Sequence, residues 1–172
     1  ERASMEHLLV RRVPPLEIML SKVWSMGLVV VGAATASLLG VVNAWLGVPL
    51  HGSVALFVAA TTVHLFATTS LGIFLATIAR SMPQFGLLLM LVLLPLQMLS
   101  GATTPRESMP EVVQVLMLAA PNTHFVMLAQ GILYRGADFA LLWPQFLALA
   151  LIGGILFGLA LARFRRTIAT MA

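Results

Sequence analysis

Few side chains could do chemistry within the apolar part of this chain, and His64 is the first candidate. It is the one titratable residue placed well inside a long apolar stretch. An imidazole there could relay a proton or contact a substrate. The commoner case is a structural imidazole that hydrogen-bonds to a neighbouring helix. We favour the structural role and keep His64 as a candidate residue of a substrate path.

Gln97 and Ser100 are two further candidates, because both lie close to Pro95, which predicts a kink in an apolar helix. Small and hydroxylated residues in apolar helices usually serve close packing and hydrogen bonding between helices. Packing is therefore the favoured role for the weakly polar residues of the apolar stretches as a group. Gln97 and Ser100 are the best candidates among them for lining a substrate path.

Several kinds of chemistry are missing from the sequence. The centres of the apolar stretches contain no Asp, Glu, Lys or Arg, whereas ion-coupled carriers and pumps usually need intramembrane acids. A phosphate-binding loop of the form G-x-x-x-x-G-K-[ST] is absent, so the chain is not expected to hydrolyse ATP. The HExxH and GxSxG motifs of hydrolases are absent too. Active transport would need energy from a partner, and no cofactor or metal is expected here.

The composition indicates a membrane protein. Hydrophobic residues make up 60% of the 172 residues and charged residues 9%, against about 25% charged residues in soluble domains. Uncharged runs cover 23–79, 81–105 and 139–162, and each exceeds the roughly 20 residues that cross a bilayer. The net charge of +4 comes from Lys and Arg near the ends of these runs. No basic stripe is interleaved with aromatic residues, so no nucleic-acid partner is expected.

The predicted fold is all-α, with four membrane spans. The cluster G-V-P-L-H-G (47–52) breaks the first run and predicts spans over 20–46 and 53–79. Further spans are predicted over 85–102 and 140–162, followed by a tail over 163–172. Residues 1–19 are amphipathic at the start, and Pro14 and Pro15 separate that part from a new helix beginning at Pro15 or Leu16.

The segment 105–138 contains two apolar stretches, each too short to cross a bilayer. They predict a helical hairpin that is external or re-entrant. Ser108 is predicted to cap the first helix and Asn122 or Thr123 the second.

The positive charges predict that both ends of the chain are cytoplasmic. With four spans, the inside segments hold most of the cations: Arg2, Arg11, Arg12, Lys22, Arg80, Arg163, Arg165 and Arg166. The outside segments hold only Arg106 and Arg135. By the positive-inside rule, 105–138 lies outside and residues 1–19 lie inside.

Three stretches resemble permease subunits of ABC-2 type exporters. E-R-A-S-M-E-H-L-L-V (1–10) is similar to the family's E-R-G-T-x-E-x-L-L pattern before a span, although Ala3 and Ser4 replace Gly and Thr. L-P-L-Q-M-L-S-G-A-T-T-P-R-E-S-M-P (94–110) resembles the end of the fifth span. A-P-N-T-H-F-V (120–126) resembles the break between external helices. The resemblance covers essentially the whole chain and is strongest to the bacterial inner-membrane drug-efflux branch.

The resemblance implies that the chain is the C-terminal part of a six-span permease. Such a permease works with a second permease copy or paralogue, with ABC ATPase subunits that bind ATP and Mg, and in this branch with a periplasmic adaptor protein. It would export a drug or hydrophobic compound across the inner membrane and would not itself be an enzyme. An ATP-independent carrier or channel, or a non-transporting membrane scaffold, remains the alternative.

The opening segment would then be the coupling helix that docks on the ATPase. Its charged residues and leucines offer salt bridges and apolar anchors: Glu1, Arg2, Glu6, Leu8, Leu9, Arg11 and Arg12. The alternative is an amphipathic helix lying on anionic lipid headgroups; the resemblance favours docking. The external helices would gate the exit, with Glu107, Pro121, Asn122 and His124 as candidate residues.

Overall fold

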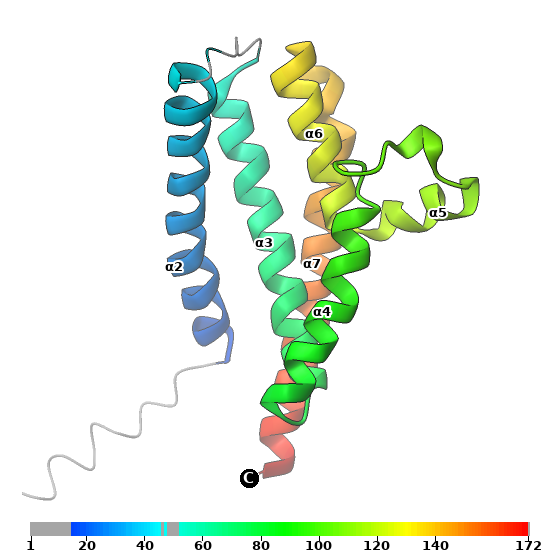
Figure 1. The fold of residues 1–172 in the computed structure, drawn as a ribbon. Coiled ribbons are helices and arrows are strands. Elements are labelled where there is room, and N and C mark those ends of the chain that lie inside the picture. Colours follow the sequence, from blue (N-terminus) through cyan, green and yellow to red (C-terminus); the bar gives the residue numbers. More distant parts are fainter. Residues whose placement is uncertain (1–14, 46, 48–51, 172) are drawn as a thin grey trace, which may run out of the picture.

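The computed structural model describes residues 15–45, 47 and 52–171, and within them the chain is helical with no strand. The long helices run up and down, and a short helix projects from their side (Figure 1). Helices α2, α4 and α6 point one way along the bundle, and α3 and α7 point the other (Figure 1). This arrangement confirms the predicted all-α class.

The first helical segment consists of α2, Pro15–Ala36, and the π-helical η1, Ser37–Trp45. Its start at Pro15 agrees with the prediction, because proline lacks the N–H that a first helical residue does not need. The segment packs mainly on α3. Gly47 has a positive φ of 64°, so the chain turns inside the predicted break.

Helices α3, Val54–Ile78, and α7, Phe139–Met171, form the most extensive helix pair. Ser53 caps α3, since its Oγ accepts from Leu56 N at 3.4 Å. Small residues bring the two backbones close: a Cβ added at Gly153 would lie 2.9 Å from Phe66 and 3.0 Å from the Cα of Ala67. The core continues along the pair through the buried Ala60, Leu149 and Ala160.

The hydroxyls of α3 bond to their own helix. Thr61, Thr62 and Ser70 each donate to the carbonyl four residues earlier, at 2.7–2.8 Å. This satisfies the hydroxyls inside an apolar environment without a partner on another helix. Small residues therefore contribute to helix packing through their small volume, which lets two helices approach closely, as at Gly153.

Two helices of the described residues are long and apolar enough to cross a membrane, Val54–Ile78 and Phe139–Arg165. They correspond to the predicted spans 53–79 and 140–162. The predicted spans 20–46 and 85–102 correspond to shorter apolar helices, Gly27–Val41 and Met82–Met98. The chain is therefore an integral membrane protein with two clear spans, and the count of four stays a prediction.

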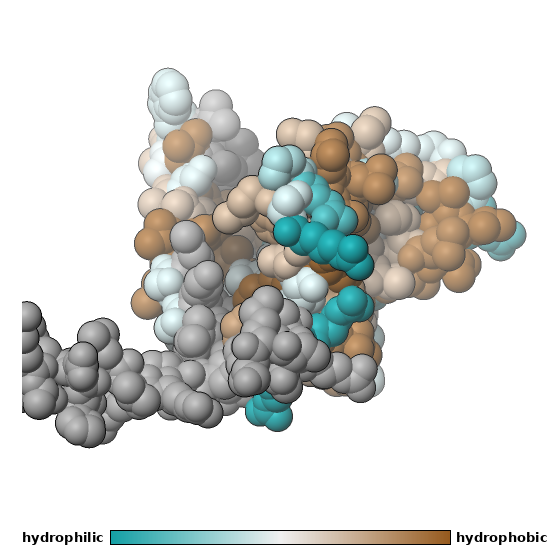
Figure 2. Space-filling model, turned by 90° about the horizontal axis from the view of Figure 1, so that it is seen from below, coloured by the Kyte–Doolittle hydropathy of each residue, from teal (hydrophilic) through white to brown (hydrophobic). Residues whose placement is uncertain are grey.

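Polar residues gather at the end of the bundle where α3 ends, α4 begins and α7 reaches its last turns (Figure 2). Arg80, Ser81, Gln84, Arg163 and Arg165 are all exposed there. Large apolar side chains are exposed on the flank, where Trp24, Leu28 and Val29 on α2 are each at least 66% exposed. The surface thus has a polar end and apolar sides, as a bilayer requires.

Helix α4 consists of Met82–Met98. The segment that follows it differs from the predicted hairpin. It contains η2, Arg106–Ser108, α5, Glu111–Leu116, η3, Met117–Ala119, and α6, Pro121–Arg135. The α5–η3 segment and α6 are bent by 97° at the break between them, so they form an open angle. Helix α5 projects from the bundle, whereas α6 lies along α3 and α7 (Figure 1).

The predicted caps of these helices are wrong. Ser108 lies in η2 and donates to Pro105 O at 2.7 Å, so it is not available to α5, which starts after Pro110. Helix α6 starts at Pro121, ahead of Asn122 and Thr123, and Ala120 at its N-cap provides no side-chain bond. A proline at the first helical position replaces the expected cap.

Candidate functional site

A cavity of about 270 Å³ lies between the end of α4, the middle of α3 and the start of α6, and we call it the α4–α6 cavity. Its lining combines neutral polar side chains with a few apolar ones and contains no Asp, Glu, Lys or Arg. The lining residues are His64, Gln97, Ser100, Ala102, Thr103, Asn122, Phe125 and Val126.

The cavity exists because the ascending helix is interrupted. Helix α4 has 17 residues, about 25 Å at 1.5 Å per residue, and it stops where α6 begins (Figure 1). His64 comes ten residues after Val54, the start of α3, or about 15 Å along a helix of about 37 Å. The interruption thus lies level with the middle third of a membrane-spanning helix.

Ser100 shapes the chain directly after α4. It is buried, and its Oγ donates to Gln97 O at 2.8 Å and accepts from Ala102 N at 3.5 Å. Gly101 follows with a φ of +95°, a conformation that side-chain-bearing residues rarely adopt. Together these residues turn the backbone sharply and bring Ala102 and Thr103 over the cavity.

Helix α6 contributes one face of its first two turns. Asn122, Phe125 and Val126 have the spacing of residues that share a helix face. The turn before them is held by His124, whose Nε2 lies 2.8 Å from Leu118 O. His124 is buried and therefore positions the start of α6 rather than lining the cavity.

His64 contacts α6 through its ring. The imidazole stacks on Phe125 with ring centroids 4.2 Å apart and planes 11° apart. Its Nδ1 is buried without a hydrogen-bond partner in the described part of the chain, and so is Asn122 Oδ1. A buried polar atom without a partner costs free energy in a membrane protein, and such atoms are commonly satisfied by water or ligand. The hydrogen bond expected between this imidazole and a neighbouring helix is not found at Nδ1, and the ring instead contacts α6 by stacking.

Arg106 braces the segment that covers the cavity. The half-buried guanidinium donates to Gln114 O at 3.2 Å and reaches Met127 Sδ at 3.9 Å. Its Cγ would lie 3.1 Å from a Cβ added at Gly101. One cation therefore connects the turn after α4 with both α5 and α6.

The structure brings together the three predicted path residues, His64, Gln97 and Ser100, with Asn122 from the predicted gate group. Pro121 is buried and lines a separate apolar cavity of about 430 Å³ between α3, α4 and α7. Glu107 is exposed in η2 and lines neither cavity. The predicted coupling residues between Glu1 and Arg12 lie outside the described residues.

Thr103, Phe125 and Val126 were not predicted from the sequence as site residues. The spacing of Phe125 and Val126 from Asn122 could have found two of them. Thr103 offered no such signal, because its position depends on the turn at Gly101.

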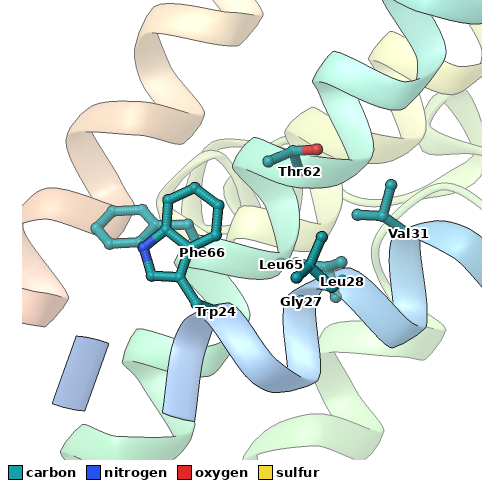
Figure 3. A pocket seen from close by; sticks show the side chains of 7 residues that line it. All are labelled: Trp24, Gly27, Leu28, Val31, Thr62, Leu65 and Phe66. Carbon is teal, nitrogen blue, oxygen red and sulfur yellow. The ribbon is translucent and has the colours of Figure 1, made fainter. Parts of the chain in front are cut away.

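A third cavity, of about 420 Å³, lies between α2 and α3, and we call it the α2–α3 groove. Trp24, Leu28 and Val31 of α2 line one side and Leu65 and Phe66 of α3 the other (Figure 3). Thr62 is its only hydroxyl, and it already donates to Val58 O. The groove is apolar, so hydrogen-bonding side chains are concentrated at the α4–α6 cavity among the three cavities described.

The sequence motifs around the α4–α6 cavity, at 94–110 and 120–126, resemble one transporter family. The family model of the ABC-2 type transporter matches residues 1–134. The chain belongs to this family. The matched range contains every residue of the α4–α6 cavity.

Relatives with known names are permeases. The chain is 62% identical over 172 residues to the inner membrane transport permease YhhJ of Escherichia coli (strain K12), a match that covers 100% of the chain and 46% of the relative. It is 24% identical over 169 residues to the probable multidrug ABC transporter permease YbhR of the same organism, covering 98% of the chain and 45% of the relative. YbhS, with the same description, is 30% identical over 140 residues, which are 79% of the chain and 36% of that relative.

The chain thus spans about half the length of the curated relatives it matches. That it corresponds to their C-terminal part stays a prediction. No solved structure matches the chain.

Proposed function

We propose that the chain is the part of an ATP-driven exporter permease that carries its substrate path, and that the α4–α6 cavity lies on this path. The observation that supports the proposal is the neutral, hydrogen-bonding cavity at an interrupted helix, level with the middle of α3. Many secondary transporters place substrate sites at discontinuous helices near the bilayer midplane, and we extend this arrangement to the exporter. The relatives' descriptions as inner membrane transport permease and probable multidrug ABC transporter permease support export across an inner membrane.

The side chains of the α4–α6 cavity offer hydrogen bonds level with the middle of α3. A substrate that enters the membrane from water loses its hydrogen bonds to water. Uncharged hydrogen-bonding side chains in the middle of the membrane lower the free-energy cost of that loss. The segment 99–110, braced by Arg106, covers the cavity on one side. Transport would proceed by alternating access, in which this segment and α6 move relative to the closely packed α3–α7 pair.

The energy would come from partner subunits. No Asp, Glu, Lys or Arg lines the cavity to couple an ion, so an ABC ATPase that binds ATP and Mg would drive the motion. Residues 1–12 would dock on it from the cytoplasm, as the family resemblance implies, with both chain ends on that side. A second permease copy or paralogue would complete the path, and a periplasmic adaptor protein would receive the substrate.

Substitution of cavity amides in the full-length permease tests the path. Gln97→Leu and Asn122→Leu each remove a hydrogen-bonding group from the cavity. We expect both to reduce drug efflux by about tenfold, the effect of one unmet hydrogen bond of about 1.4 kcal/mol. Gln145→Leu is the matched control, because Gln145 lies on α7 and does not line the cavity. Equal efflux by all three variants at equal membrane abundance would contradict the proposed path.

Two further measurements separate the proposed exporter from the alternatives. Efflux by the permease in vesicles without any ATPase would indicate a secondary carrier or channel. Binding to the ATPase with no effect of drugs on its turnover would indicate a scaffold. Leu8→Asp combined with Leu9→Asp tests docking: we expect loss of co-purification with the ATPase, and unchanged co-purification and efflux would contradict it.

A further inference from the structure

The α4–α6 cavity has a pattern of charge and dipole that selects among ligand classes. The C-terminal end of α4 and the N-terminal end of α6 meet at it. A helix carries partial negative charge at its C-terminus and partial positive charge at its N-terminus. Opposite partial charges therefore border the same space, which favours a ligand that is dipolar without net charge.

Full charges are absent from the cavity lining. Its polar groups are the two amides of Gln97 and Asn122, the hydroxyls of Ser100 and Thr103, and the imidazole of His64. The nearby Arg106 guanidinium is directed to Gln114 O and Met127 Sδ and is not a lining residue. A buried ion without a counter-charge is strongly disfavoured, so an anionic or cationic group would lack a partner here.

Two polar atoms on lining residues have no partner among the described residues, Asn122 Oδ1 and His64 Nδ1. The space of about 270 Å³ equals about nine water molecules at about 30 Å³ each. It is large enough for a small ring with one polar substituent. Asn122 Oδ1 accepts and so needs a donor, whereas His64 Nδ1 donates or accepts according to its tautomer. A group that can both donate and accept satisfies the two atoms in either tautomer.

We propose that the α4–α6 cavity binds an uncharged group that both donates and accepts hydrogen bonds, of the carboxamide class. This inference rests on the proposed function and names the substrate chemistry of the same site. A carboxamide matches the amide side chains of Asn122 and Gln97, because each amide offers one carbonyl oxygen and one NH₂. Its dipole also matches the two helix ends.

Three probes of the same shape but different charge test the proposal: 4-fluorobenzamide, 4-fluorobenzoate and 4-fluorobenzamidine. Binding to the full-length permease in lipid nanodiscs is measured by fluorine NMR line broadening at neutral pH. We expect the benzamide to bind about tenfold more tightly than either charged probe, since each charged probe leaves hydrogen-bonding groups of the site unmatched. Asn122→Leu weakens benzamide binding about tenfold for the same reason, while Gln145→Leu leaves it unchanged.

Asn122→Asp provides a second test, in which the expected result is a gain of binding rather than a loss. The new carboxylate should give the benzamidine a counter-charge. The variant should therefore bind the benzamidine more tightly than the benzamide. Tighter binding of the benzoate by the unmodified protein would overturn the proposal in favour of an anion site at the start of α6. Tighter benzamidine binding, or equal binding of all probes regardless of Asn122, would overturn it as well.

These measurements need neither an ATPase nor transport, so they separate the two proposals. Loss of efflux in Asn122→Leu without benzamide selectivity would retain the path and remove the carboxamide class. Benzamide selectivity with normal efflux in Asn122→Leu would show a binding site of the proposed class that lies off the transport path.

Discussion

The α3–α7 pair and the region around the α4–α6 cavity both contain glycines and small polar residues. The two helices of the pair are in close contact, whereas α4 and α6 leave a cavity between them. In the α3–α7 pair, Gly153 lies against Ala67 so closely that a Cβ would overlap its neighbours. Along the α4–α6 path, a helix stops, a turn follows at Gly101, and a polar cavity remains. Small residues thus allow two continuous helices to pack without a gap, whereas the interruption of the backbone after α4 leaves a cavity.

The difference explains how one membrane domain can contain a rigid part and a part that moves. In the α3–α7 pair, the hydroxyls of Thr61 and Ser70 are satisfied within α3 itself. The segment that follows α4 is instead joined to α5 and α6 by the side chain of Arg106, through Gln114 O and Met127 Sδ. Segments held by few contacts open at lower free energy than a closely packed core.

The largest expected effect is at the helix crossing. Gly153→Leu would place four carbons where Phe66 and Ala67 already lie, and we expect the free energy of unfolding to fall by about 3 kcal/mol. Gly154→Leu is the control, because nothing lies within 4 Å of a Cβ added there. Thermal unfolding of the purified full-length variants measures the difference. Similar destabilisation by both would contradict close packing of α3 on α7 at Gly153.

A smaller effect is expected at the brace of the α4–α6 path. Arg106→Met keeps a long side chain but removes the donor to Gln114 O, which should lower the free energy of local opening by about 2 kcal/mol. Hydrogen–deuterium exchange of residues 101–116 should therefore become roughly 30-fold faster. Arg135→Met, an exposed position in the last turn of α6, should leave this exchange unchanged. Unchanged exchange in Arg106→Met would show that the segment is held by other contacts.

The turn at Gly101 should show a still smaller effect. Gly101→Ala introduces a side chain at a φ of +95°, which costs about 1 kcal/mol of backbone strain. The same change at Gly86 meets open space on α4 and should be neutral or slightly stabilising. Chemical unfolding of both variants compares them. An equal effect at the two glycines would contradict the left-handed turn.

The smallest effect is expected for the α3 hydroxyls. Thr61→Val removes a bond to Phe57 O in the same helix and keeps the size of the side chain, so stability should change by less than about 0.6 kcal/mol. A loss comparable to that of Gly153→Leu would show that Thr61 holds α3 to another helix. Thermal unfolding of the Thr61→Val variant and of the unmodified protein measures this difference in stability.

Much of the fold could be predicted from the sequence. The predicted span 53–79 agrees with α3 to within one residue at both ends, and the predicted start at 140 agrees with the start of α7 to within one residue. Helix α7 continues past 162 to Met171, because arginines are compatible with a helix that leaves the membrane. The start of α6 was misplaced because Pro121 begins the helix, whereas the prediction relied on polar caps.

The candidate site could be predicted only in part. Gln97 and Ser100 were found from their closeness to Pro95, and His64 from its isolation, but their meeting with Asn122 depends on where α4 stops and α6 starts. That depends on the turn at Gly101 and on the angle of 97° between the α5–η3 segment and α6. The glycine permits the turn locally, but its packing against Arg106 and Val126 and the angle between the helices are tertiary features.

The central claim is that the α4–α6 cavity places a polar, water-accessible space deep beside α3. The chain contains no cysteine, so single cysteines report on it once any cysteine elsewhere in the full-length protein is replaced by serine. We predict that a charged methanethiosulfonate reagent, which reacts with ionised thiols in water, modifies the Gln97→Cys variant. The adjacent Met98→Cys variant, at an exposed apolar position outside the cavity lining, should react at least about tenfold more slowly, because its thiol faces lipid and ionises poorly there. Equal modification of the two, or an unreactive Gln97→Cys variant, would contradict the account.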